Sequence, residues 1–147
     1  MELPELRTRY RTRRELRGRD SDAVAQAVTA WAKGKDERLQ LEALWVSWGA
    51  GRLDQALLQN LLKSSDHRIR SAALNVLRFN YSSIQGASAL LKKAASDPHG
   101  RVRMTATVTA SYLPRRAGLD VLEAIEQKDI NKLYSQTYDF AREVLNR

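Results

Sequence analysis

The sequence predicts an all-α fold in which helical hairpins stack into an α-solenoid, and three observations predict it. First, a cation followed by an aliphatic residue, with a small residue four positions later, occurs four times in the 147 residues. The aliphatic positions are 30, 33 and 31 residues apart, a period typical of helical repeat arrays. Second, apolar residues recur at helical spacing. Third, every connection between the predicted helices is short. The four copies are Arg38-Leu39 with Ala43, Arg68-Ile69 with Ala73, Arg101-Val102 with Ala106, and Lys132-Leu133 with Thr137.

The first element is expected to be a leading helix over residues 4–17, with Pro4 in its first turn and Gly18 as its stop. Four helical hairpins follow, at about residues 21–48, 53–79, 83–113 and 117–146. An aspartate that can cap the helix precedes the second helix of each hairpin, at Asp36, Asp66, Asp97 and Asp129. Residues 1–147 are therefore expected to form one repeat domain.

Two of the expected boundaries rest on single residues. Ser82 with Gln85 three positions later is a capping-box pattern for the first helix of the third hairpin. Gly118 is expected to precede the short first helix of the last hairpin. The small residue of each copy is expected at a close helix crossing, where a larger side chain would overpack.

Composition excludes several classes of protein. The chain has no cysteine, so it forms neither disulfides nor thiolate metal sites. It has no apolar run of about 18 residues, so no membrane insertion is expected. Its N-terminus has no apolar stretch of the kind a signal peptide needs. A net charge of +8 favours acidic partners, although cations on solvated helix faces would give the chain the same net charge without any such partner.

Two of the repeats resemble HEAT repeats. DHRIRSAALNVL (66–77) and DPHGRVRMTATVTASYL (97–113) are similar to the second helix of such repeats, and RLQLEALWV (38–46) and KLYSQTYDFA (132–141) are weaker copies. Together with TRYRTRREL (8–16), they resemble the HEAT region of the PVC-type haem-binding CxxCH proteins. That resemblance implies a HEAT/armadillo-like superhelix from a larger exported bacterial protein with dehydrogenase-like and haem domains. This chain has no CxxCH motif, so no catalytic, cofactor or haem-binding residue carries over.

The candidate binding surface is a stripe of cations at equivalent repeat positions. Its members are Arg38, Arg68, Arg70, Arg101, Arg103 and Lys132. One interpretation is a basic track for phosphates or an acidic protein surface. The other is a structural ladder, in which these cations pair with the aspartates of the turns. The sequence leaves both open.

Other candidate residues have plain structural interpretations. Seven arginines within residues 7–19 are expected on a solvated capping helix or on one docked to a further domain. His67 and His99 are expected to face solvent separately, and two histidines without cysteine make a poor metal site. The three tryptophans invite comparison with HEAT-like DNA glycosylases, but packing is the simpler interpretation. The tyrosines expected to pack or cap the ends are Tyr10, Tyr112, Tyr134 and Tyr138.

The function expected from the sequence is a non-catalytic interaction or spacer module. It is expected to need no cofactor or metal, and to be a monomer when isolated. Its partner is expected to be a protein or an adjacent domain of the same parent protein, in an extracytoplasmic compartment by the family resemblance. The alternatives left open are a basic-groove nucleic-acid-binding protein and a HEAT-like DNA glycosylase.

Overall fold

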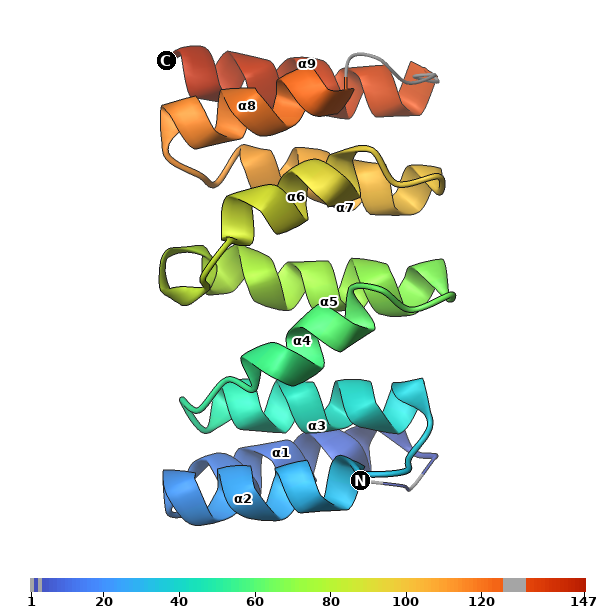
Figure 1. Ribbon diagram of the computed structural model, residues 1–147, viewed down its shortest axis with the longest axis vertical. Coiled ribbons are helices and arrows are strands. Elements are labelled where there is room, and N and C mark those ends of the chain that lie inside the picture. Colours follow the sequence, from blue (N-terminus) through green and yellow to red (C-terminus); the bar gives the residue numbers. More distant parts are fainter. Residues whose placement is uncertain (1, 3, 126–131) are drawn as a thin grey trace. The chain divides into compact units, whose positions relative to one another are not determined.

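The computed structural model describes residues 2, 4–125 and 132–147, without the side chains of residues 132 and 133. Within these residues the regular structure is entirely helical, with nine α-helices and one short 3₁₀ turn (Figure 1). The all-α prediction is therefore confirmed for the described chain. None of the described helices combines the length and apolar character that crossing a membrane requires. The chain divides into two compact units, residues 1–65 (unit 1) and 66–147 (unit 2).

Unit 1 is organised around its third helix. Its helices are α1 (Leu6–Arg17), α2 (Ser21–Ala32), α3 (Glu37–Gly49) and α4 (Gln55–Leu61). Helix α3 contacts the other three, and its buried Ala43 and Val46 pack with Val28 of α2. Asp20 and Asp36 each accept a hydrogen bond from the backbone N–H three residues later, at 2.8 and 2.9 Å. The cap at Asp36 was expected from the sequence and is confirmed.

A buried carboxylate attaches the leading helix to this unit. Glu42 of α3 is 1% exposed, and arginines of α1 provide its countercharge. Arg9 Nη1 lies 2.9 Å from Glu42 Oε1, and Arg13 Nη1 lies 3.5 Å from Oε2. The arginine-rich segment is thus only partly a solvated face, because two of its arginines neutralise a carboxylate that would be costly to bury alone.

Unit 2 is organised around α7. Its helices are α5 (His67–Phe79), α6 (Ala87–Ala95), α7 (Gly100–Ala110), α8 (Arg115–Ile125) and α9 (Lys132–Asn146). Helix α7 contacts all four others, and α5, α7 and α9 run in the same direction in Figure 1. Ala73 of α5 and Ala106 of α7 are 0% exposed, like Ala43 in unit 1, so the predicted burial of these three small residues is confirmed. Thr137, the fourth, is half-buried.

The capping box expected at Ser82 is wrong. Residues Tyr81–Ser83 form the 3₁₀ turn, and α6 begins only at Ala87. Gly86 at its start has a φ of +73°, a left-handed conformation that glycine adopts without a Cβ penalty. The backbone change at Gly86 sets the start of this helix, and the cap position of α6 makes no side-chain hydrogen bond.

The expected role of Gly118 is also wrong. Helix α8 begins at Arg115, directly after Pro114, and Gly118 lies buried inside it. A Cβ at this position would lie 2.6 Å from the carbonyl oxygen of Ala110 and 2.7 Å from a methyl carbon of Leu145. Gly118 is therefore a close-approach residue, where α8 meets the end of α7 and the side of α9. The cap predicted at Asp129 lies outside the described residues.

Candidate functional site

The structure describes five of the six predicted cations, four of them in unit 2. Arg68 and Arg101 are exposed near the start of α5 and α7, whereas Arg70 and Arg103 are half-buried. Arg38 is exposed near the start of α3 in unit 1. The side chain of Lys132 lies outside the described residues. The candidate site is therefore built from unit 2.

Arg70 forms the central ion pair of this unit. Its Nε and Nη2 donate to Asp97 Oδ2 and Oδ1, each at 2.8 Å, and the two side chains are only 13% and 10% exposed. Burial would raise the pKa of Asp97, but the hydrogen bonds from Arg70 and from the backbone N–H of His99 hold that pKa below its usual value. The pair ties α5 to the turn before α7, as the ladder interpretation expected.

Asp97 does not cap α7, contrary to the sequence-based expectation. It accepts a hydrogen bond from the N–H of His99, two residues later, as in an Asx turn. His99 is the N-cap instead, and its Nδ1 accepts from the N–H of Arg101 at 3.2 Å. Arg103 donates to the carbonyl oxygens of Asp97 and Pro98, at 2.9 and 3.1 Å. Arg70 and Arg103 thus stabilise the turn.

The two exposed cations differ in their partners. Arg68 Nη2 lies 2.7 Å from Asp66 Oδ2. This side-chain hydrogen bond, together with a second one from the backbone N–H of Arg68, lowers the pKa of Asp66 to about 2. Asp66 also caps α5 by accepting from that N–H at 2.8 Å, as expected. Among the described residues, Arg101 has no ion-pair partner. Of the four stripe cations in unit 2, Arg101 is therefore the one whose side chain is paired with neither a carboxylate nor a carbonyl oxygen among the described residues.

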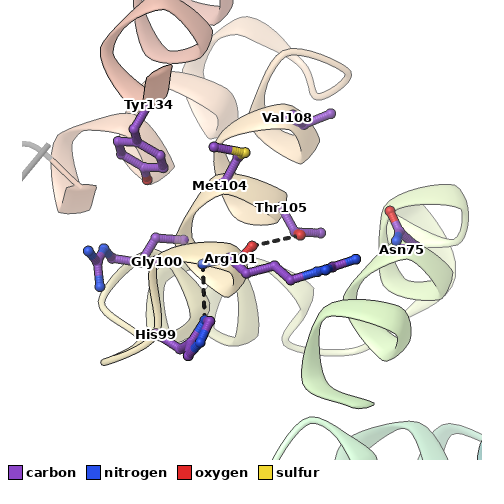
Figure 2. A pocket seen from close by; sticks show the side chains of 9 residues that line it. Asn75, His99, Gly100, Arg101, Met104, Thr105, Val108 and Tyr134 are labelled. Atoms are coloured by element: carbon purple, nitrogen blue, oxygen red, sulfur yellow. Dashed lines mark hydrogen bonds between the residues drawn. The ribbon is translucent and has the colours of Figure 1, made fainter. Parts of the chain in front are cut away.

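Arg101 borders a cavity of about 630 Å³ between α5, α7 and α9. Figure 2 shows four α7 residues along it at helical spacing, with Asn75 on the α5 side and Tyr134 on the α9 side. The four are Arg101, Met104, Thr105 and Val108. The Tyr134 hydroxyl lies 2.9 Å from Thr107 Oγ1, and burial raises the pKa of the phenol. The cavity combines an apolar wall with a cationic rim, which suits an apolar side chain flanked by carboxylates.

The two histidines meet at the start of α5 and α7, which the sequence analysis missed. Their rings stack with centroids 3.5 Å apart and an angle of 7° between the planes. Burial lowers the pKa of His67, and His99, Arg68 and Arg101 lower it further, against the opposing charge of Asp66. The two histidines are one position out of register in the repeat, since His67 lies two residues before Ile69 and His99 lies three residues before Val102. The available signal was only that both lie at the start of the second helix of a repeat.

This stack predicts a pH-dependent stability. Because the pKa of His67 is lowered in the folded chain, the unfolded chain binds the proton more readily. Stability should be highest above the unfolded pKa of about 6.5 and should fall as pH drops toward the folded value. Melting temperatures measured from about pH 7.5 to pH 5.5 should fall less steeply for His67→Gln than for the wild type. An equal slope in both proteins would exclude the stack as the cause.

An aromatic cluster lies one helical turn beyond the cavity. The Arg78 guanidinium is 4.4 Å from the Phe79 ring centroid and 4.9 Å from that of Tyr112. Phe79 and Tyr112 are 62% and 70% exposed. Of the two roles expected for the tyrosines, packing is therefore excluded for Tyr112, whereas Tyr134 and Tyr138 are buried. Exposed aromatic and arginine side chains are the types that dominate protein–protein binding energies.

The candidate site is therefore the exposed side of α5 and α7, which we call the α5–α7 face. It comprises Arg68 and Arg101 at one end, the cavity in the middle, and the Arg78 cluster at the other end. The sequence predicted the cations but neither the cavity nor the cluster. Compared with protein-family models, with curated proteins and with solved structures, the chain matches none.

Proposed function

We propose that this chain is a non-catalytic interaction module of HEAT-like repeats, whose α5–α7 face binds an acidic protein segment carrying an apolar anchor. The repeat interpretation is supported by the equivalent environments of Ala73 and Ala106 and by the Arg70–Asp97 pair between consecutive second helices. The solenoid arrangement of all four hairpins, as one domain, is part of this proposal. The family resemblance implies where the bound segment would come from, namely an adjacent domain of a larger exported bacterial protein.

One observation carries the proposal: a cavity with an apolar wall lies between Arg101, which has no ion-pair partner in the part of the chain that the structure describes, and an exposed aromatic cluster. Met104 and Val108 offer apolar contact to an anchor side chain, and Arg101 offers a charged partner to a carboxylate beside it. Phe79 and Tyr112 extend the same side of the helices with aromatic surface. Affinity in such interfaces comes from a few anchors in pockets, while surrounding charges select the partner and raise the association rate.

Nucleic acid remains the alternative ligand for the basic stripe. Phosphate binding depends on cations that release counterions, and here Arg68 and Arg70 are already paired with carboxylates while Arg103 donates to carbonyl oxygens. The aromatic cluster and the apolar wall have no role in contacting a duplex backbone. Both features favour the protein segment. A HEAT-like glycosylase has no such supporting observation on this face.

Selection from a library of displayed random peptides is expected to enrich sequences with several carboxylates around one aromatic or aliphatic residue. The strongest binder should bind roughly tenfold more weakly to the Arg101→Glu variant. The substitution replaces the positive charge that faces the carboxylates of the peptide with a negative charge that repels them. Fluorescence anisotropy with the labelled peptide measures this. Arg116→Glu on α8 is the matched control, since it is exposed, makes the same change in net charge and lies outside the cavity.

Two outcomes would contradict the proposal. Equal losses for Arg101→Glu and Arg116→Glu would mean that only net charge is recognised. Duplex DNA that displaces the peptide, with log affinity falling against log salt by about 0.9 per phosphate contact, would favour the nucleic-acid alternative.

A further inference from the structure

The stacked histidines lie at the end of the α5–α7 face, next to the cation that the proposed function uses. His99 lines the cavity together with Arg101, and its Nδ1 accepts the hydrogen bond from the backbone N–H of Arg101 (Figure 2). The half-buried ring of His67 lies on the ring of His99, with the two centroids 3.5 Å apart. A positive charge on His67 is therefore only one ring away from the rim of the cavity.

His67 is the member of the pair that can take up a proton without losing a hydrogen bond. Among the described residues, the side chain of His67 has the stacking contact with His99 but no hydrogen bond. His99 differs, because its Nδ1 is the acceptor that caps α7 and would become a donor on protonation. A proton added to the pair is therefore expected on His67.

The carboxylates nearest the pair already have other partners. Asp66, the residue before His67, pairs with Arg68 at 2.7 Å. Asp97, in the turn before α7, pairs with Arg70 at 2.8 Å. Both negative charges are thus balanced by arginines, and a proton on His67 adds a net positive charge to this end of the face.

The other titratable and charged groups around the pair disfavour that proton in the free chain. Burial lowers the pKa of His67, and the neighbouring His99 lowers it further. The positive charges of Arg68 and Arg101 act in the same direction. Across the cavity, on α9, burial raises the pKa of the Tyr134 phenol, so this group stays neutral. The pair is therefore uncharged at about pH 7, and a negative charge brought to the cavity would favour its protonation.

We propose that the stacked histidines make the α5–α7 face pH-sensitive, so that mild acid strengthens the binding of the acidic segment. This inference rests on the proposed function and adds the regulation of that same site. A carboxylate at the cavity rim favours the charged imidazole, and by linkage the charged imidazole favours the carboxylate to the same extent. The effect falls between about pH 7.5 and about pH 5.5, where histidine titrates while glutamate remains ionised.

The test follows the binding of a synthetic peptide, in which glutamates flank one leucine, to the full chain by calorimetry at the two ends of this pH range. The peptide should bind about threefold to tenfold more tightly at the lower pH, as expected for one added charge near the rim. Near the middle of the range, the measured heat should vary with the ionisation enthalpy of the buffer, because a proton is taken up on binding. Circular dichroism at each pH verifies that the chain is folded.

The matched variant is His67→Gln with His99→Asn, which removes the only two histidines of the chain. Asparagine is a favourable N-cap residue, so the start of α7 keeps a side-chain acceptor. This variant should bind the peptide equally at both pH values, without a buffer-dependent heat. His67→Gln alone should remove most of the pH effect, because the proton is expected on that ring.

The outcomes separate this inference from the proposed function. Wild-type binding that is unchanged or weaker at the lower pH overturns the inference, as does a pH effect of the same size in the histidine-free variant. The proposed function stands in both cases if Arg101→Glu still weakens binding at the higher pH. Absence of peptide binding at both pH values contradicts the proposed function and this inference together.

Discussion

Replacing Asp97 with asparagine is expected to destabilise unit 2 by about 2–3 kcal/mol, the cost of losing hydrogen bonds to a charged group and leaving its partner unmatched. Arg70 donates two hydrogen bonds of 2.8 Å to this carboxylate, at a position where both side chains are almost buried. An asparagine keeps the size of the side chain, but it cannot accept both donors or neutralise the guanidinium. Urea denaturation of both proteins at pH 7 measures the difference.

The matched control is Asp120→Asn, which breaks the exposed pair between Lys92 and Asp120 in the same unit. That substitution should cost about 0–1 kcal/mol, because both charges remain hydrated. The Asp97 effect should also depend on pH. Because the folded chain lowers the pKa of Asp97, the stabilisation is present above the unfolded pKa of about 3.9 and is lost as pH falls through the folded value. Equal effects of the two substitutions at pH 7 would contradict the assigned role of Arg70.

Gly118→Ala is expected to destabilise unit 2 by about 1–3 kcal/mol, the usual cost of overpacking. The added methyl group would lie 2.6 Å from a backbone carbonyl oxygen of Ala110, which moves only if α7 or α8 shifts. Alanine is favoured over glycine inside a helix by about 1 kcal/mol, so a purely local effect would have the opposite sign. Thermal unfolding followed by circular dichroism distinguishes overpacking, which lowers the melting temperature, from the local helix effect, which raises it.

Gly100→Ala provides the control for this substitution. Gly100 is also helical, but a Cβ there would meet only the flexible end of Arg103, at an ordinary contact distance of 3.7 Å. This variant should be neutral or slightly stabilised. A stabilised Gly118→Ala would show that α8 does not approach α7 and α9 as closely as described.

Local chemistry made much of the fold predictable. Asp36 and Asp66 were recognised as caps because a short side-chain acceptor before an apolar stripe acts within three residues of chain. The buried Ala73 and Ala106 were recognised because their spacing repeats with the period of the chain. Signals of this kind need no knowledge of how the helices pack.

Features that depend on packing could not be predicted in this way. Gly118 looked like a helix stop because glycine often ends helices, whereas the approach of Leu145 and Ala110 gives the reason for glycine here. Asp97 looked like a cap, but Arg70, 27 residues away, draws its carboxylate into an ion pair. Glu42 carried no sequence signal, since only the docking of α1 makes it buried.

The candidate site shows the same division. The cations of the stripe were predicted from their repeat positions, yet the sequence could not separate Arg101, which is unpaired among the described residues, from Arg70, which is nearly buried in an ion pair. The cavity is lined by residues of α5, α7 and α9, so it is a property of three helices together. The stacked histidines likewise depend on how two repeats meet.

The central claim is that the α5–α7 face binds an acidic segment with an apolar anchor. An NMR titration of the isotope-labelled chain with a selected acidic peptide tests it most directly. The account predicts that the largest shift changes fall on Arg101, Met104, Thr105 and Val108, with Phe79 and Tyr112 following, while α2 and α8 stay unchanged. Shift changes centred on any other face, or spread evenly over the exposed cations of the chain, would contradict it.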